Sequence, residues 1–362
     1  MKKVKASVDG LELSHVARVA AHGTVSTSLA LRSDRELGDL ADAASPLGTG
    51  IGGTSALLEV HGTPVFVKRV PLTDLERQAE NVRSTANLFG LPSFCHYGIG
   101  GPGFGAWREL AVHVMTTNWV LAREHEGFPL MYHWRVLPHP GQSLPEELAD
   151  VDRAVAYWGG GAAVRRRIEA LRESTASIAL FLEYIPQNLH DWFGAEVTAG
   201  DEAVERACAM VTMQLPAGTS FMNARGLVHF DAHFQNILTD GKRLFFTDYG
   251  LALSSGFGLS KDEAAFFTAH RTYDRSYALT HLVIWLITAL YGYQGDQRSA
   301  FLRACARGER PTGIPPKAAA LISRHAPLAV VMTDFYRKLQ GESRQTPFPL
   351  EQIRRIGGLD TP

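Results

Sequence analysis

The sequence has few cysteines, no excess of charge of one sign and no long hydrophobic run, and each absence excludes a class of protein. Its three cysteines, Cys95, Cys208 and Cys305, stand far apart and form no C-x-x-C pair. We therefore expect buried thiols rather than a zinc site or a disulfide framework. The 36 basic and 37 acidic residues nearly cancel, which argues against a nucleic-acid partner.

The most apolar run covers residues 282–291, about half the length that spans a bilayer. We expect this run to form a buried helix. No apolar stretch follows the basic residues at the start of the chain, so we expect no secretory signal, no membrane partner and a cytoplasmic location. The 362 residues, of which 45% are hydrophobic, suit a large core divided between two packed lobes.

The N-terminal half combines short strand patterns with helical patterns. Residues 1–45 are interpreted as an N-terminal extension. Apolar residues three or four positions apart predict a helix over 72–89, which Thr73 and Glu76 would begin as a capping box. The other expected elements are helices over 33–44 and 107–122, strands over 56–60, 64–70, 129–137 and 178–184, and a glycine-rich turn over 46–53.

The segment 138–177 is interpreted as an insertion that contains a polar helix over 162–174. Three consecutive arginines on this helix, Arg165, Arg166 and Arg167, are expected to form a solvated face. Beyond it, we expect a helix from Leu189 and mainly helical structure from residue 203, interrupted between 226 and 253.

A first chemical motif combines a glycine pattern with a lysine on the following strand. Gly48, Gly50 and Gly53 lie between two predicted strands, which disfavours a Rossmann turn and favours a hairpin over nucleotide phosphates. Lys68 ends the strand motif Val-Phe-Val-Lys and can reach the same phosphate oxygens. At about 4 Å such a pair attracts by about 4 kcal/mol before desolvation. A generic turn and an exposed strand lysine remain the alternatives.

A second motif consists of two polar segments joined by a hairpin turn at residues 240–241. The hairpin brings Asn236 and Asp248 near each other. An amide oxygen and a carboxylate are hard ligands of the kind that Mg²⁺ prefers. Asp231 precedes Asn236 by five positions and can therefore face an incoming hydroxyl beside the metal.

Together these motifs resemble the protein-kinase-like superfamily over roughly residues 46–253. The glycines resemble its glycine-rich loop, and Lys68 matches the lysine of its V-A-I-K strand. Residues 229–236 resemble H-R-D-x-x-x-x-N, and residues 248–250 resemble D-F-G. Residues 182–186 resemble the hinge between the lobes, where backbone groups of Glu183 and Ile185 would meet adenine.

The resemblance implies an α+β, bilobal protein-kinase-like fold. Its N-lobe, an antiparallel sheet plus helix C, would cover residues 46–183 including the insertion, and a mainly helical C-lobe would cover 184–362. ATP and Mg²⁺ would be the cofactors. The resemblance implies that Asp231 accepts the proton, that Asn236 and Asp248 bind the metal, and that Lys68 binds phosphate. It also implies a glutamate that orients Lys68; Glu80 is the choice and Glu76 is the rival.

Three departures from the kinase pattern bear on the acceptor. Phe230 replaces the arginine of H-R-D, so we expect no activation by loop phosphorylation. No A-P-E follows Asp248, which predicts a missing or remodelled peptide-docking platform. His233 stands two residues after Asp231, where aminoglycoside- and choline-type kinases often have histidine, and it joins the predicted catalytic group; a structural histidine is the alternative.

The leading functional prediction is transfer of the γ-phosphate of ATP to Ser or Thr of a peptide or protein, such as a natural-product precursor peptide. A second prediction is a small-molecule O-phosphotransferase similar to aminoglycoside kinases, favoured by His233, the missing A-P-E and the insertion. A third is a catalytically inactive scaffold. The presence of Lys68, Asp231, Asn236 and Asp248 disfavours that third reading.

Overall fold

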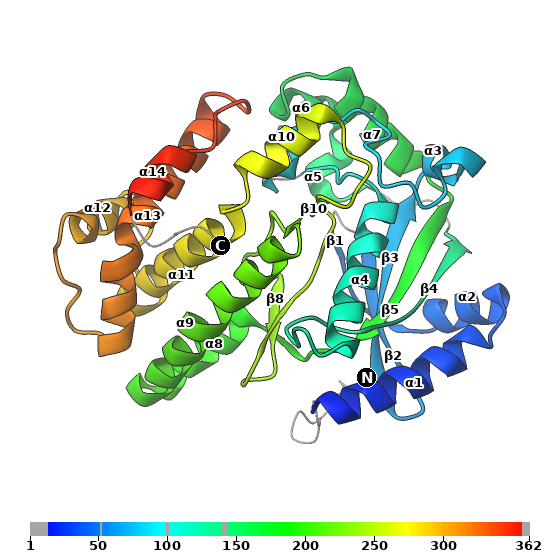
Figure 1. The fold of residues 1–362 in the computed structure, drawn as a ribbon, viewed down its shortest axis with the longest axis horizontal. Helices are drawn as coiled ribbons and strands as arrows, with labels where there is room; N and C mark the ends of the chain where they lie inside the picture. Colours follow the sequence, from blue (N-terminus) through cyan, green and yellow to red (C-terminus); the bar gives the residue numbers. More distant parts are fainter. Residues whose placement is uncertain (1–13, 51–52, 99–100, 140–143, 357–362) are drawn as a thin grey trace.

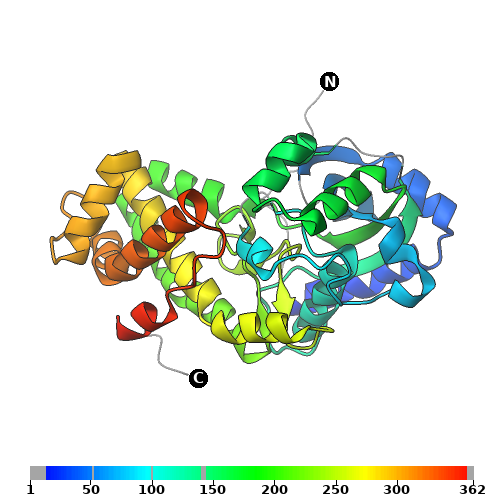
Figure 2. The same cartoon turned by 90° about the horizontal axis from the view of Figure 1, so that it is seen from above.

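An antiparallel sheet and a larger set of helices make up the residues that the computed structural model describes, which are 14–50, 53–98, 101–139 and 144–356. The fold is α+β. The sheet lies at one end of the molecule and the last helices, coloured orange to red, lie at the other (Figure 1, Figure 2). The main hydrophobic core is continuous between these two parts, because it includes residues of the sheet and of the C-terminal helices.

Five strands form the main sheet in the order β1-β2-β3-β5-β4, with every neighbouring pair antiparallel. The strands are β1 (Ser45–Gly50), β2 (Gly53–Val60), β3 (Thr63–Leu72), β4 (Met131–Pro138) and β5 (Ala176–Glu183). All four predicted strands are confirmed. The expected glycine-rich turn instead contributes β1, while Ile51 and Gly52 lie outside the described residues.

The helix expected over 72–89 is wrong beyond its first turn. Thr73 and Glu76 form the predicted capping box, but only α3 (Asp74–Arg77) and the 3-10 turn η2 (Ala79–Asn81) follow. The side chain of Asn81 donates to the carbonyl of Leu75 at 2.9 Å, and this carbonyl would otherwise accept a bond from the next helical turn. The chain leaves the helix at Gln78, where ψ is 140°, and runs on to the 3-10 turn η3 (Ser93–Tyr97).

The helix expected over 107–122 is confirmed as α4 (Ala106–Leu121), which contacts β3, β4 and β5. The insertion forms α5 (Glu146–Ala149), α6 (Val151–Tyr157) and α7 (Ala162–Glu173), which confirms the expected polar helix. Its arginines do not all face solvent. Arg167 is 3% exposed and pairs with Glu76, whereas Arg165 pairs with Asp152 at the surface.

Two N-terminal helices, α1 (His15–Ala30) and α2 (Asp34–Asp42), pack beside β4. The second confirms the expected helix over 33–44, and Ser33 begins it with a capping box. Val25, Leu29 and Leu37 are fully buried in the main core. The described part of the expected extension is therefore packed on the sheet.

The remaining elements form the helical part and two small sheets. The helices are α8 (Leu189–Ala199), α9 (Asp201–Ala224), α10 (Lys261–Ala269), α11 (Tyr273–Tyr291), α12 (Gly295–Ala306), α13 (Pro316–Gly341) and α14 (Leu350–Arg355). The short strands are β6 (Gln187–Asn188), β7 (Leu227–Val228), β8 (Ile237–Thr239), β9 (Leu244–Phe246) and β10 (Leu253–Ser254). The hairpin expected at residues 240–241 joins β8 to β9.

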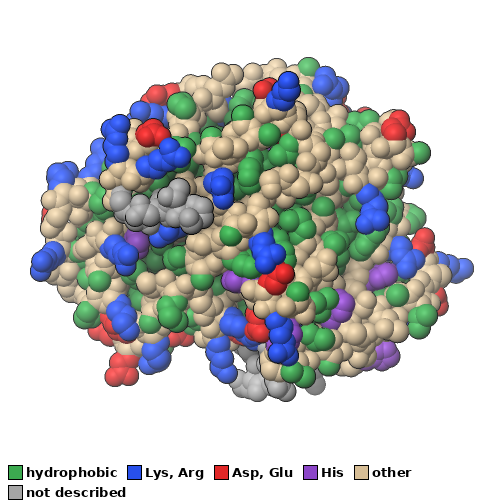
Figure 3. Space-filling model, viewed as in Figure 1, with side chains coloured by type: hydrophobic (Ala, Val, Ile, Leu, Met, Phe, Trp, Pro, Cys, Tyr) green, Lys and Arg blue, Asp and Glu red, His purple; other side chains and the backbone are tan. Residues whose placement is uncertain are grey.

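The expectations from composition are met where the structure tests them. All three cysteines are free and buried. The apolar run 282–291 lies in α11 and buries Leu282, Val283, Leu286 and Ile287. Across the described ranges, no helix combines the length and the apolar character needed to cross a membrane. Basic and acidic side chains are interspersed over the face drawn in Figure 3.

The hydrogen bonds of His270 predict how stability changes with pH. Its Nδ1 donates to the carbonyl of Phe266 and its Nε2 accepts from the Tyr97 hydroxyl, each at 2.6 Å, so the ring is neutral. Burial lowers its pKa to about 4. As the pH falls, His270 is therefore protonated near pH 6.5 in the unfolded chain but only near pH 4 in the folded chain. This difference lowers the free energy of unfolding as the pH falls between these two values.

Urea unfolding of His270→Gln and the unchanged protein between pH 7 and pH 4 tests this. The difference in unfolding free energy between the two should shrink by up to ~1.4 kcal/mol per pH unit below about pH 6.5, because the variant lacks the titrating ring. Parallel curves would mean that His270 takes up its proton as readily in the folded protein as in the unfolded chain.

Candidate active site

One cavity of about 920 Å³ lies between the sheet and the helical part. Its lining includes residues from β1, β2 and β3, the end of β5, the segments around Asp231 and Asp248, and helices α11 and α13. Nine residues of the predicted site line this cavity, and Glu80 does not; the nine are Gly48, Gly53, Lys68, Glu183, Ile185, Asp231, His233, Asn236 and Asp248. Segments far apart in the sequence therefore present their polar side chains to a common space.

Lys68 is held by two carboxylates inside this cavity. Its Nζ lies 2.7 Å from Oε1 of Glu109 and 2.9 Å from Oδ1 of Asp248. Lys68 is 9% exposed, so the alternative of an exposed strand lysine is wrong. Burial acts to lower the pKa of Lys68, but Asp248 and Glu109 outweigh it and the pKa is raised. Lys68 is therefore a fixed cation at neutral pH.

The prediction that Glu80 or Glu76 orients Lys68 is wrong, because Glu109 on α4 does so. Glu80 is exposed on the turn η2. Glu76 is buried, but its carboxylate accepts from the backbone N–H groups of Thr73 and Ala106 and pairs with Arg167 at 2.9 Å. A sequence signal for Glu109 existed, since it is an acidic residue in the first turn of the apolar helix expected over 107–122.

Asp274, in the first turn of α11, fixes the segment that carries Asp231. Its carboxylate accepts from the backbone N–H groups of His229 and Phe230 at 2.7 and 2.8 Å. Phe230 has φ +64°, a conformation that strains any residue other than glycine. Its ring is fully buried, in contact with the rings of Tyr273 and other aromatic residues. Sequence reasoning missed Asp274, which carries no motif of its own.

Asp231 faces the cavity and is bound to the neighbouring polar residues. Its Oδ2 accepts from the Asn236 side-chain amide at 2.9 Å, and His233 Nε2 lies 3.7 Å from its Oδ1. Burial and the nearby Asp248 raise the pKa of Asp231 to about 7. A carboxyl with a pKa close to neutrality is suited to accept a proton in a reaction.

Asn236 and Asp248 fit the predicted magnesium site by their chemistry. The side-chain amide nitrogen of Asn236 donates to Asp231, so the amide oxygen of Asn236 is the potential metal ligand. Burial acts to raise the pKa of Asp248, but Lys68 outweighs it and lowers the pKa to about 2, so the carboxylate stays charged. In the described ranges no three His, Cys, Asp or Glu side chains cluster as a metal site. Two oxygen ligands completed by phosphates and water suit Mg²⁺.

Two of the predicted phosphate-loop glycines line the cavity where β1 meets β2. Gly48 and Gly53 border the cavity, and Gly50 pairs with Gly53 across the strands. Gly53 has φ +116°, and a Cβ atom there would lie 1.9 Å from the carbonyl oxygen of Arg69. A side chain at Gly53 would therefore push β2 away from β3 and Lys68.

Glu183 and Ile185 line the cavity at the end of β5, as expected for the hinge segment. The backbone N–H of Glu183 is already used, because it donates to the carbonyl of Leu130 at 2.7 Å. This N–H group is therefore not free to bind adenine. The carbonyl of Glu183 and the backbone of Ile185 remain candidates.

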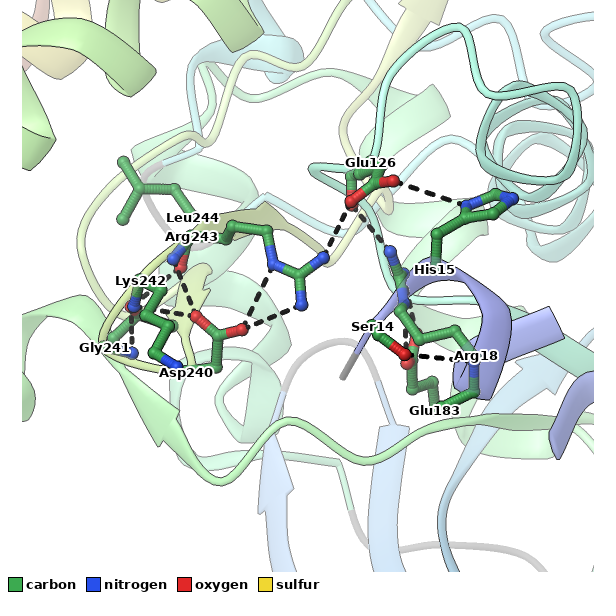
Figure 4. A network of polar contacts seen from close by, with 12 residues as sticks. Ser14, His15, Arg18, Glu126, Glu183, Asp240, Gly241, Lys242, Arg243 and Leu244 are labelled. Carbon is green, nitrogen blue, oxygen red and sulfur yellow. Dashed lines mark hydrogen bonds and ion pairs between the residues drawn. The ribbon is translucent and has the colours of Figure 1, made fainter. Parts of the chain in front are cut away.

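The Glu183 side chain belongs to a polar network that joins α1 to the hinge segment (Figure 4). Arg18 on α1 binds both carboxylate oxygens of Glu183 at 2.8 Å and also donates to the carbonyls of Glu126 and Phe128. Glu126 in turn pairs with Arg243 on the β8–β9 hairpin at 2.7 Å. The first described helix is thus tied to two segments that form the cavity.

Neither a scan against models of known protein families nor a search of curated proteins finds a match for this chain. Statements about function therefore depend on the contacts in this cavity. The decisive contacts are those of Lys68 with Glu109 and Asp248.

The corrected partner of Lys68 predicts different effects for two glutamates. Replacing Glu109 by Gln removes one of two countercharges from a buried lysine, and we expect a loss of about 2–3 kcal/mol in unfolding free energy. Glu80→Gln, at an exposed position, should change it by less than about 0.5 kcal/mol. Chemical denaturation of both variants measures this, and equal effects would contradict the assignment of Glu109.

Proposed function

We propose that this protein is an ATP- and Mg²⁺-dependent phosphotransferase with a bilobal, protein-kinase-like architecture, which moves the γ-phosphate of ATP to a hydroxyl. The single observation that carries the proposal is the simultaneous pairing of Lys68 with Glu109 and Asp248. These residues come from a strand, a helix and a remote hairpin. A purely structural ion pair needs only one partner, whereas a phosphate-binding lysine must be held in place and must keep its proton.

The proposed roles follow from the contacts. Lys68, oriented by Glu109, would bind the α- and β-phosphates. Mg²⁺ held by Asn236 and Asp248 would neutralise charge on the phosphate oxygens. Asp231 would orient the acceptor hydroxyl and take its proton while the new P–O bond forms and the bond to the β-phosphate breaks, which releases ADP. The bond from Asn236 to Asp231 supports this role, since it links the metal ligand to the base.

Two acceptor classes follow from the sequence, a Ser or Thr hydroxyl of a peptide and a hydroxyl of a small molecule. The cavity favours the second, because it continues past Asp231 to side chains of α11 and α13. His233 lies beside Asp231 and lines the same space, where it would contact the acceptor. An inactive scaffold is disfavoured, since the four polar groups that transfer requires all line one cavity.

Replacing Asp231 by Asn tests the proposed proton acceptor. We expect transfer of labelled γ-phosphate to fall roughly 10²- to 10⁴-fold, because the amide cannot take the hydroxyl proton. Binding of Mg²⁺ and nucleotide should change little. Asp262→Asn, at an exposed position on α10, is the matched control and should keep full activity.

The measurement is mass-spectrometric detection of the phosphorylated product together with release of ADP. Turnover by Asp231→Asn equal to that of the unchanged protein would refute the role given to Asp231. Nucleotide binding by the unchanged protein without transfer to any hydroxyl would favour the scaffold.

A further inference from the structure

The far wall of the cavity, beyond Asp231, is built from two helices of the C-terminal half. We call it the α11–α13 wall. It consists of Tyr277, Thr280, His281 and Ile284 on α11 and Thr333, Tyr336 and Gln340 on α13. His233 lies next to this wall, with its ring centroid 6.1 Å from that of His281. An acceptor whose hydroxyl reaches Asp231 would rest against these side chains.

The wall carries no formal charge. None of its seven residues is Asp, Glu, Lys or Arg. Burial lowers the pKa of His281 to about 4, so this ring is neutral at neutral pH.

Among the charged residues that line the rest of the cavity, Asp231 faces the acceptor and the others are mostly engaged elsewhere. Lys68, Glu109 and Asp248 bind one another, and Glu183 is bound by Arg18. Arg167 is paired with Glu76, and Glu147 is exposed on α5.

Two hydroxyls of the wall are buried and have no hydrogen-bond partner among the described residues. They are Oγ1 of Thr280 and Oγ1 of Thr333, one on each helix. Thr280 is 3% exposed. A buried hydroxyl without a partner costs stability. Neither oxygen is accessible to solvent in its present position, but both residues line the cavity, so a rotation of each side chain would bring its hydroxyl to a ligand there. These two hydroxyls therefore point to a ligand with hydroxyl or carbonyl groups of its own.

Aromatic rings border the same space. The rings of Tyr277 and His281 meet edge to face with centroids 4.5 Å apart, and Tyr277 lies 5.8 Å from Tyr336. Aromatic faces provide apolar contact area, while hydroxyl and imidazole groups at their edges form hydrogen bonds. This combination suits a ring with an apolar C–H face and a polar rim.

We propose that the α11–α13 wall is the acceptor subsite for a neutral polyhydroxylated ring, such as a sugar or a cyclitol. This inference rests on the proposed phosphotransferase activity and names its substrate class. A polycationic aminoglycoside would bring several ammonium groups to a wall that has no carboxylate of its own, and the neighbouring Asp231 is engaged with the acceptor hydroxyl. Ammonium groups without a countercharge there would be costly. An anionic acceptor would likewise find no cation on the wall.

A peptide acceptor is disfavoured by the segment that follows Asp248. The backbone N–H of Gly258 donates to Oγ1 of Thr85 at 2.9 Å, and Glu263 pairs with the buried Arg108 at 2.7 Å. These contacts bind the segment to the part of the chain near the sheet. The groups involved are thus not available to bind an extended peptide.

A binding and transfer experiment on the full chain tests the proposal. With Mg²⁺ and a non-hydrolysable ATP analogue present, ligand-observed NMR would report binding of neutral monosaccharides and cyclitols, an aminoglycoside and a Ser/Thr peptide pool. With ATP, mass spectrometry would report phosphorylation of each. We expect saturable binding and phosphorylation of at least one neutral polyol, and a preference for it over the aminoglycoside and the peptides.

Variants of the two hydroxyls provide the residue-level test. Thr280→Val and Thr333→Val keep the side-chain shape, and each should raise the KM of the polyol about 5- to 20-fold by removing one hydrogen bond. The KM of ATP should not change. Thr268→Val is the control, because its exposed hydroxyl donates to the carbonyl of Ala264 on α10.

The outcomes separate this inference from the proposed function. The acceptor class would be overturned if the aminoglycoside or the peptides were phosphorylated faster than every neutral polyol. It would also be overturned if no neutral polyol bound or was phosphorylated. In either case, nucleotide binding would leave the phosphotransferase proposal standing. Unchanged polyol KM in both valine variants would overturn the α11–α13 wall as the subsite. Absence of nucleotide binding would contradict the phosphotransferase itself.

Discussion

The contact on which the site depends is a buried lysine held between two carboxylates. A single buried ion pair gains little, since removing two charges from water offsets their attraction. Here Lys68 faces both Glu109 and Asp248, which leaves the cluster with a net negative charge and the ammonium permanently protonated. Such a cluster is suited to a ligand that brings its own cation. Magnesium bound to a nucleotide meets that condition, and this is the physical reason for the proposed function.

The fold positions this cluster by joining segments that are far apart in the sequence. β3 supplies Lys68, α4 supplies Glu109, and the segment that follows β9 supplies Asp248. Asp248 and Phe230 both have φ near +65°, so the backbone is left-handed at Asp248 and at the residue before Asp231, where it strains Phe230. Bonds from the backbone of His229 and Phe230 to Asp274 hold this strained segment. Strain of this kind persists only where the surroundings fix the backbone.

Much of this arrangement could be predicted from local patterns, and the failures have physical causes. Strand periodicity, the hairpin at residues 240–241 and the capping box at Thr73 depend on neighbouring residues, and the structure contains all of them. Periodicity failed over 72–89, because the backbone leaves the helical conformation at Gln78 and the Asn81 side chain then binds the carbonyl of Leu75. The assignment of Glu80 failed for the same reason, since it assumed that this segment was the helix beside Lys68. Asp274 and Arg18 act through contacts with remote backbone groups, which sequence spacing does not reveal.

The most direct test of the central claim is calorimetric titration of the full chain with a non-hydrolysable ATP analogue, with and without Mg²⁺. The account predicts saturable binding that strengthens when Mg²⁺ is present and loses this dependence in Asp248→Asn. Absence of binding at millimolar nucleotide, or binding that Mg²⁺ and Asp248→Asn leave unchanged, would contradict it.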